Sequence, residues 1–347
     1  MDAHAAARWL WSATTPRARL ARASLVPAAV AYAACVRLRA RAYQHGLLRR
    51  GGVGVPVIAV GNLSVGGTGK TPIVGWVAAL CARSGLTPGI VLRGWGGDET
   101  QVHRERVPEA IVVEGRDRLR AARRAVRFGA RALVLDDGYQ RLDLRRDLDL
   151  LLVSADAGDA APWTLPAGPW REPWSAVRRA DMVIVTRKYS GTEAAARLVS
   201  RITSSGISPA SVGVVRLALT RLTTLHTSHP VELASLRSAR VLAISGVADP
   251  DSFAHQLASL GALVRAMPHP NHHRYSARDL SRLVSVAMGA DYVVMTAKDA
   301  VKLRRLWPPP SPTALVAHLE PKWEQGERLI TSRITDLLTR HYAHDMY

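Results

Sequence analysis

Short apolar runs alternate with longer amphipathic stretches from about residue 55 onward, which is the pattern of buried strands separated by helices. We expect strands over 55–60, 89–92, 132–135, 149–153, 182–186, 212–217, 241–245, 262–266 and 292–296. Helices are expected over 71–84, 249–260 and 277–287, the second capped by Asp249 with Pro250 at its first position. This alternation predicts an α/β fold with parallel sheets flanked by helices.

The same pattern divides the chain. Residues 223–240 lack a strong period and are expected to separate two α/β lobes, a core over 51–222 and a C-terminal lobe over 223–347. A proline-rich stretch at 308–312 precedes the last expected strand and a polar C-terminal helix. Residues 1–50 carry many arginines and almost no acidic side chains, and we expect them to form a separate membrane-associated helical segment.

An apolar run over 23–36 lies within that first segment, between Arg22 and Arg37. Its fourteen residues span roughly 21 Å as a helix, less than the ~30 Å hydrocarbon core of a bilayer. Three interpretations stay open: a helix in the membrane interface, a buried helix of a soluble fold, or a cleaved signal peptide ending near Ala31-Tyr32-Ala33. We favour the first, and we disfavour the signal peptide because the phosphate loop described below needs a nucleotide, which is cytosolic.

Composition narrows the partners without choosing one. The 347 residues contain 47 Lys and Arg against 28 Asp and Glu, a formal charge of +19, which favours nucleic acid, phosphorylated small molecules or an anionic membrane. Two cysteines exclude a disulfide scaffold and a cysteine-rich metal module. Only five of the cations are lysines, so each lysine suggests a site that needs a compact point charge.

A glycine-rich loop joins the first expected strand to its helix. We expect nucleotide phosphates to bind its residues Ser64, Val65, Gly66, Gly67, Thr68, Gly69, Lys70 and Thr71. Lys70 would neutralise the β and γ oxygens and the Thr71 hydroxyl would ligate Mg²⁺. Ser64 replaces the first glycine of the strict pattern, and Val65 replaces the second lysine of the dimeric deviant-loop ATPases, which argues against that class. The alternative is a glycine turn without a ligand.

Two aspartates end a neighbouring apolar strand over 132–135. Alone, such a pair is more often a turn or a helix cap, but beside a phosphate loop it is expected to serve the nucleotide. We assign Asp136 to Mg²⁺ and Asp137, together with Lys70, to catalysis. The fold class expected is therefore a parallel sheet of the P-loop NTPase type.

Several blocks, in order, resemble the tetraacyldisaccharide 4′-kinase family, the lipid A kinases. The agreement runs from the N-terminal apolar helix to about residue 305 and is far more specific than the loop alone. The matching blocks are Gly61-Asn62, 65–72, 115–118, Asp136-Asp137-Gly138-Tyr139-Gln140, 144–147, 165–173, 179–181, 246–253, 271–273 and 296–303.

The resemblance implies transfer of the γ-phosphoryl group of ATP, with Mg²⁺, to the 4′-hydroxyl of an acylated glucosamine disaccharide 1-phosphate. It places the enzyme on the cytosolic face of the bacterial inner membrane, with an anionic membrane surface as partner and no nucleic acid partner. It also implies substrate binding by Arg93, Gln140, Arg171 and Glu172. Arg171 would grip an anionic group bidentately, or would form only a loop salt bridge with Glu172.

On the acceptor side we hypothesise that Asp98, paired with His272, contacts the sugar hydroxyl. The chain departs from the family there: Thr100 replaces a proline, the stretch before Asp98 is short, Asn271 replaces an aspartate and Ala297 a glutamate. The alternative for Asp98 is a turn residue, and for the histidines a polar loop or cap. A zinc site is disfavoured for lack of suitably spaced ligands.

Three functions compete. We favour an active, divergent lipid-sugar kinase, because phosphoryl transfer relies mostly on positioning and charge neutralisation. A weakened homologue that binds nucleotide and membrane is the second, and a P-loop ATPase acting on nucleic acid is the third. The sequence shows no aromatic-rich platform for stacking single-stranded bases, which argues against the ATPase acting on nucleic acid.

Overall fold

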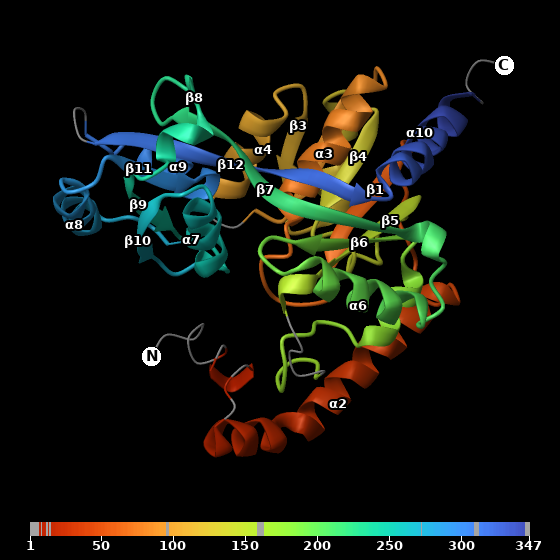
Figure 1. Cartoon of the computed structure of the whole chain (residues 1–347). Coiled ribbons are helices and arrows are strands. Elements are labelled where there is room, and N and C mark those ends of the chain that lie inside the picture. The colour runs from red at the N-terminus through yellow and green to blue at the C-terminus, as the bar shows by residue number, and fades with distance from the viewer. Residues whose placement is uncertain are drawn as a thin grey trace. The chain divides into compact units, whose positions relative to one another are not determined.

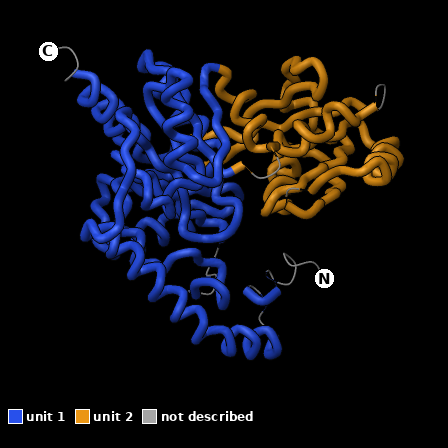
Figure 2. The backbone as a smooth tube through the Cα atoms, turned by 180° about the vertical axis from the view of Figure 1, so that it is seen from behind, with its two compact units in different colours: residues 1–93, 109–215, 323–347 blue, residues 94–108, 216–322 orange. Residues whose placement is uncertain are grey.

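The computed structural model describes residues 7, 9–11, 13, 15–94, 97–157, 163–271, 273–308 and 312–343. The chain forms two compact units, which Figure 2 colours separately. Unit 1 contains residues 1–93, 109–215 and 323–347, and unit 2 contains residues 94–108 and 216–322. This division differs from the expected lobes, because residues 94–108 and 216–222 belong to unit 2, while residues 1–50 and the C-terminal residues 323–347 belong to unit 1.

Unit 1 is built on a sheet of seven strands in the order β7-β6-β5-β1-β4-β2-β3, with parallel pairing from β6 to β3. The strands are β1 (Val57–Asn62), β2 (Pro88–Leu92), β3 (Ile111–Glu114), β4 (Ala132–Asp136), β5 (Leu148–Ser154), β6 (Met182–Arg187) and β7 (Val212–Thr224). The chain fills the side of β4 first and the side of β5 afterwards. The order therefore reverses next to β1, and ligands of such sheets bind at the carboxyl ends of the strands at this point.

Helices cover this sheet (Figure 1). Besides the N-terminal helix, they are α3 (Lys70–Arg83), α5 (Arg118–Arg127), α6 (Thr192–Thr203) and α10 (Glu327–Ala343). Short 3-10 turns occur at Ala155–Ala157, Trp174–Arg179, Pro209–Ser211 and, in unit 2, Leu233–Leu236. Helix α3 is the most deeply buried of them, because apolar side chains occur on all its sides. The strand, and the helix after it, that carry the phosphate loop thus form the centre of the unit.

The N-terminal helix α2 (Pro16–Gln44) has 29 residues, twice the apolar run seen in the sequence, and is long and apolar enough to cross a membrane by length and composition alone. Only Ala18, Ala29 and Ala33 are buried, so the interpretation as a core helix of a soluble fold does not hold. The helix is fastened to unit 1 by Thr164, whose hydroxyl donates to the Ala29 carbonyl at 2.8 Å.

The strands of unit 2 follow the order β10-β9-β11-β12-β7, with β8 on β7, in the same sheet that β7 continues into β6. Its elements are α4 (Asp98–Arg106), β8 (Pro230–Val231), β9 (Arg240–Ser245), α7 (Pro250–Ser259), β10 (Leu263–Pro268), α8 (Ala277–Ala287), β11 (Tyr292–Thr296), α9 (Ala297–Leu303) and β12 (Thr313–Gln325). The expected cap of α7 is confirmed, since the Asp249 carboxylate accepts from the Ser252 amide at 3.2 Å. Helix α4 belongs here because its Glu105 pairs with Arg304 after α9.

Candidate active site

The phosphate loop leaves the carboxyl end of β1 and leads directly into α3. Gly66 and Gly69 have φ of 137° and 82°, a left-handed backbone that favours glycine. Gly61 is needed for a different reason, since a Cβ there would lie 2.8 Å from the backbone nitrogen of Tyr139. The loop thus ends on the N-terminus of a helix, where free N–H groups attract anions.

Lys70 is held by two side chains on unit 1. Its Nζ donates to Asn62 Oδ1 at 3.1 Å and lies 3.5 Å from Asp137 Oδ1. The fully buried Asn62 also donates from Nδ2 to the carbonyl of Ser64 at 2.7 Å. One amide side chain therefore orients both the loop backbone and the lysine that serves it.

The two aspartates at the end of β4 have different surroundings. Asp136 is buried and belongs to the strand beside β1, with Val60 as its register partner. Asp137 follows with φ of 55° and accepts from Arg171 Nη1 at 2.9 Å and 2.7 Å. Burial raises the pKa of Asp137, but Lys70 and Arg171 outweigh burial and lower it below the usual range. Asp137 is therefore ionised at neutral pH.

Glu172 and Gln140, both expected to bind substrate, are engaged inside the protein. Glu172 is 3% exposed, and its Oε1 accepts from Arg179 Nη2 at 3.0 Å and from Gln140 Nε2 at 3.0 Å. Gln140 also donates to the backbone carbonyl of Asn62 at 2.9 Å. This arrangement favours a role in bracing the phosphate loop over contact with substrate.

Sequence reasoning missed three side chains that support the loop: Asn62, Arg179 and Thr186. Thr186 is the residue before the end of β6, and its hydroxyl donates to the Thr68 carbonyl at 3.0 Å. Asn62 and Arg179 lie in blocks that resemble the family, and this resemblance is the only signal for them in the sequence. Thr186 had no signal, because a threonine at a strand end is common.

Two arginines lie towards the same edge of the sheet. Arg93, an expected substrate ligand, is exposed and comes directly after β2. Arg118 is buried, and burial lowers its pKa to about 10, followed by repulsion from Arg141, with attraction from Asp137 and Asp136 in the opposite direction. The carboxylates therefore lie in a field of positive charge that suits a polyphosphate.

In unit 2, Asp98 opens α4 after Gly97 and is almost fully buried. Its Oδ2 lies 3.0 Å from Lys302 Nζ, and the next residue, Glu99, lies 2.6 Å from Lys298 Nζ. Both lysines come from α9. His272 lies outside the described residues, so its pairing with Asp98 stays a prediction.

The segment around His272 is tied down by its described neighbours. His269 and His273 stack with ring centroids 4.7 Å apart, and His273 Nε2 lies 3.2 Å from Asp279 Oδ2. Burial lowers the pKa of His269, which keeps it neutral near pH 7. Tyr275 donates to the fully buried Asp299 at 2.8 Å.

The oxygen donors of Asp136 and Thr71 suit a magnesium ion that also binds substrate phosphates, rather than a metal enclosed by protein ligands alone. Asp136 offers a buried carboxylate. Thr71 follows Lys70 as the second residue of α3, and its side chain is partly exposed. Within the described parts of the chain, no cluster of three His, Cys, Asp or Glu side chains is placed to hold a metal. Mg²⁺ commonly binds one or two protein oxygens together with substrate phosphates, which agrees with this set.

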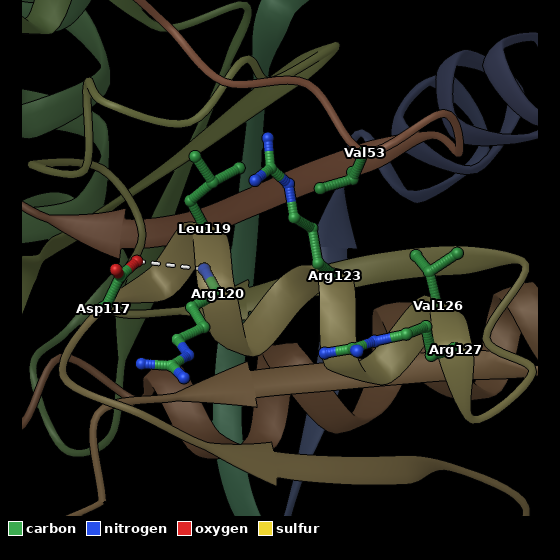
Figure 3. Close-up of a pocket in the computed structure, with 7 residues that line it drawn as sticks. All are labelled: Val53, Asp117, Leu119, Arg120, Arg123, Val126 and Arg127. Atoms are coloured by element: carbon green, nitrogen blue, oxygen red, sulfur yellow. Dashed lines mark hydrogen bonds between the residues drawn. The ribbon is translucent and has the colours of Figure 1, made fainter.

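A cavity of about 700 Å³ lies elsewhere on unit 1. Figure 3 shows it between α5 and Val53, which precedes β1, with lining residues along the length of α5 from Asp117 to Arg127. Its lining is Val53, Asp117, Leu119, Arg120, Arg123, Val126 and Arg127. Asp117 there caps α5, its Oδ1 accepting from the Arg120 amide at 3.0 Å.

The family described as tetraacyldisaccharide-1-P 4′-kinase matches residues 21–106 and 96–338 of the chain. The chain belongs to this family. The tetraacyldisaccharide 4′-kinase of Geobacter sulfurreducens is 37% identical over 311 residues, covering 82% of this chain and 85% of its own length. That of Anaeromyxobacter dehalogenans (strain 2CP-C) is 36% identical over 321 residues and covers 85% of both.

A solved structure of a tetraacyldisaccharide 4′-kinase family protein, LpxK of Aquifex aeolicus in complex with ATP, superimposes with a TM-score of 0.70 at 26% identity. It covers 92% of this chain and 99% of its own. The expected family, fold class and kinase class are thereby confirmed. The alternative of an ATPase acting on nucleic acid receives no support from these comparisons.

Proposed function

We propose that this kinase transfers the γ-phosphoryl group of ATP to the 4′-hydroxyl of a tetraacylated glucosamine disaccharide 1-phosphate, a step of lipid A biosynthesis. The observation that carries the proposal is the constellation at the carboxyl ends of β1 and β4. There Lys70 is oriented by Asn62 at 3.1 Å beside the ionised Asp137. Such a loop, lysine and carboxylate set is suited to phosphoryl transfer.

In the proposed reaction the acceptor oxygen bonds to the γ-phosphorus, the bond to the β–γ bridging oxygen breaks, and ADP leaves. Lys70 and the loop N–H groups neutralise charge on the transferred group. Thr71 and Asp136 would hold Mg²⁺, which supplies further charge neutralisation when bound. Asp98, with His272, is proposed to orient the acceptor hydroxyl and take up its proton, and Asp137 to keep Lys70 and Arg171 in position.

We further propose that α2 attaches the kinase to the anionic cytoplasmic face of the inner membrane. Leu20, Val30 and Leu38 are 75%, 54% and 62% exposed on this helix, so their apolar surface is available for contact with acyl chains. Arginines of the same helix would reach the phosphate headgroups. The acylated substrate resides in the same surface.

The test is phosphate transfer from labelled ATP, with Mg²⁺, to the disaccharide 1-phosphate in detergent. We expect acceptor-dependent product from the intact chain and a loss of at least about 100-fold in Lys70→Ala, because a preorganised charge on the transferred group is removed. Lys322→Ala, at an exposed lysine of β12, is the matched control and should retain full activity. ATP consumption that ignores the acceptor would contradict the proposal.

A further inference from the structure

The turn after β6 is built around one carboxylate. Three consecutive backbone N–H groups donate to Asp156: Lys188 at 2.8 Å, Tyr189 at 3.2 Å and Ser190 at 2.9 Å. Asp156 itself lies in the 3-10 turn directly after β5. The carboxyl ends of two adjacent parallel strands are thus fastened together, and the backbone of 188–190 is fixed.

This turn is connected to the phosphate loop. Thr186, the residue before the end of β6, is 1% exposed and donates to the Thr68 carbonyl at 3.0 Å. Three residues of extended chain span at most about 10 Å, so Tyr189 lies within that distance of Thr186 along the backbone. Strands β5 and β6 also lie on the opposite side of β1 from β4, the strand that ends at Asp136.

Tyr189 presents an aromatic ring at this place. The residue is 52% exposed, although its hydroxyl donates to the Asp156 carbonyl at 3.3 Å. The ring is therefore tethered at its backbone and at its hydroxyl, both to Asp156, while much of its surface faces outward. A tyrosine held in this way loses little conformational entropy when a flat ligand stacks on it.

We propose that Tyr189 is the platform on which the adenine base of the nucleotide stacks, and that Asp156 is the positioning residue that holds the platform. The inference rests on the proposed function, since it assigns the base end of the nucleotide whose phosphates Lys70 serves. The sheet order agrees with it, because the order reverses between β4 and β5 around β1 and ligands bind at the carboxyl ends there.

The decisive measurement compares two ligands of the intact chain, MgATP and inorganic tripolyphosphate with Mg²⁺, which has the phosphates but no base. Stacking on an aromatic side chain is worth enough that Tyr189→Ala should raise the Kd for MgATP roughly tenfold or more. The Kd for tripolyphosphate should stay unchanged. Tyr189→Phe keeps the ring and should bind MgATP within about twofold of the parent.

Phe128→Ala is the matched control, because Phe128 is an aromatic residue of the same unit, 59% exposed, at the end of α5. It should alter neither Kd. For Asp156→Asn we expect a higher KM for ATP with kcat nearly unchanged, and unaltered tripolyphosphate binding. A general loss of folding would instead weaken the binding of both ligands and reduce kcat at the same time.

The outcomes separate the two proposals. A parent chain that binds neither ligand would remove the proposed function itself. Tyr189→Ala with parental affinity for MgATP, while Lys70→Ala loses both ligands, would overturn only the base platform. Equal weakening of MgATP and tripolyphosphate by Tyr189→Ala would overturn it as well, because the effect would then lie in the phosphate loop.

Discussion

Asn62 and Asp137 show how single side chains prepare a lysine for a phosphate. An ammonium on a four-carbon stem is mobile, and ordering it costs conformational entropy. Lys70 Nζ lies 3.1 Å from Asn62 Oδ1 and 3.5 Å from Asp137 Oδ1. The side chain is therefore already ordered before a phosphate binds, and less conformational entropy is lost on binding. The motif predicted Lys70 and both aspartates, whereas Asn62 was part of a family-like block with no assigned role, because its role depends on contacts that only the fold creates.

Arg171 should control the acid limb of the pH–rate profile. Burial raises the pKa of Asp137, and Lys70 and Arg171 lower it. Arg171→Ala removes one of the two lowering charges, so the pKa rises and the acid limb of kcat moves to higher pH. The measurement is kcat for disaccharide phosphorylation over a pH range that extends from neutral to below the usual pKa of an aspartate. The control is Arg145→Ala, at an exposed arginine, which should leave the pH–rate profile unchanged. An unshifted profile for Arg171→Ala would show that the ionisation of Asp137 does not control kcat.

Glu172 should matter for stability before it matters for substrate. Glu172→Gln leaves Arg179 beside a neutral amide in a buried site, and we expect a loss of about 2–3 kcal/mol in the free energy of unfolding. Denaturant unfolding measures it. The control is Glu193→Gln on α6, whose partner Arg197 is 3.9 Å away with both side chains largely exposed, and which should change stability by less than about 0.5 kcal/mol. Equal stability of both variants would contradict the bracing role.

At the scale of elements, the sequence predicted best where burial was complete. The strands of unit 1 read as apolar runs because both faces of a parallel sheet are covered, and helix 277–287 has the predicted bounds. Helices α4, α5, α6 and α9 and the short strands β3 and β8 were missed. Helix α5 is half arginine and buries mainly alanines, so its apolar stripe is faint in the sequence although its packing is definite.

Helix α2 should govern attachment to lipid. Leu20 and Val30 are exposed on it, and each would contribute about 1.5–3 kcal/mol if buried among acyl chains. Leu20→Asp with Val30→Asp should lower partitioning onto phosphatidylglycerol vesicles at least tenfold, as measured by flotation. Leu263→Asp, 63% exposed on β10 of unit 2, is the control and should float with the parent. A double variant that floats equally well would exclude α2 as the anchor.

At the scale of the whole molecule, the order of segments along the chain is not the order of the units. Residues 94–108 leave unit 1 for unit 2, and β12 carries the chain back so that 323–347 complete unit 1. The sequence indicated two α/β lobes and a boundary near 222. It could not indicate these exchanges, because they depend on long-range pairs such as Glu105 with Arg304, and α10 with α3.

Helix α10 should therefore stabilise the nucleotide-binding unit although it ends the chain. Ile334 is fully buried on α10, while Leu329 of the same helix is 40% exposed. Ile334→Ala should lower the free energy of unfolding by about 2–5 kcal/mol because it leaves a cavity. Tryptophan fluorescence follows the unfolding, and its nine sources include the pair Trp76 on α3 and Trp323 on β12, whose ring centroids are 4.9 Å apart.

Leu329→Ala is the matched control and should cost well under 1 kcal/mol, since a mostly exposed side chain leaves no cavity. Ile334→Ala should also release bound MgATP at a lower denaturant concentration, because α10 packs on α3 and α3 begins at Lys70. If Ile334→Ala instead unfolds a part of the chain that leaves the tryptophan signal and MgATP binding intact, the C-terminal helix does not support the phosphate loop. The coupling of the last helix to the first strand and loop is thus open to direct measurement.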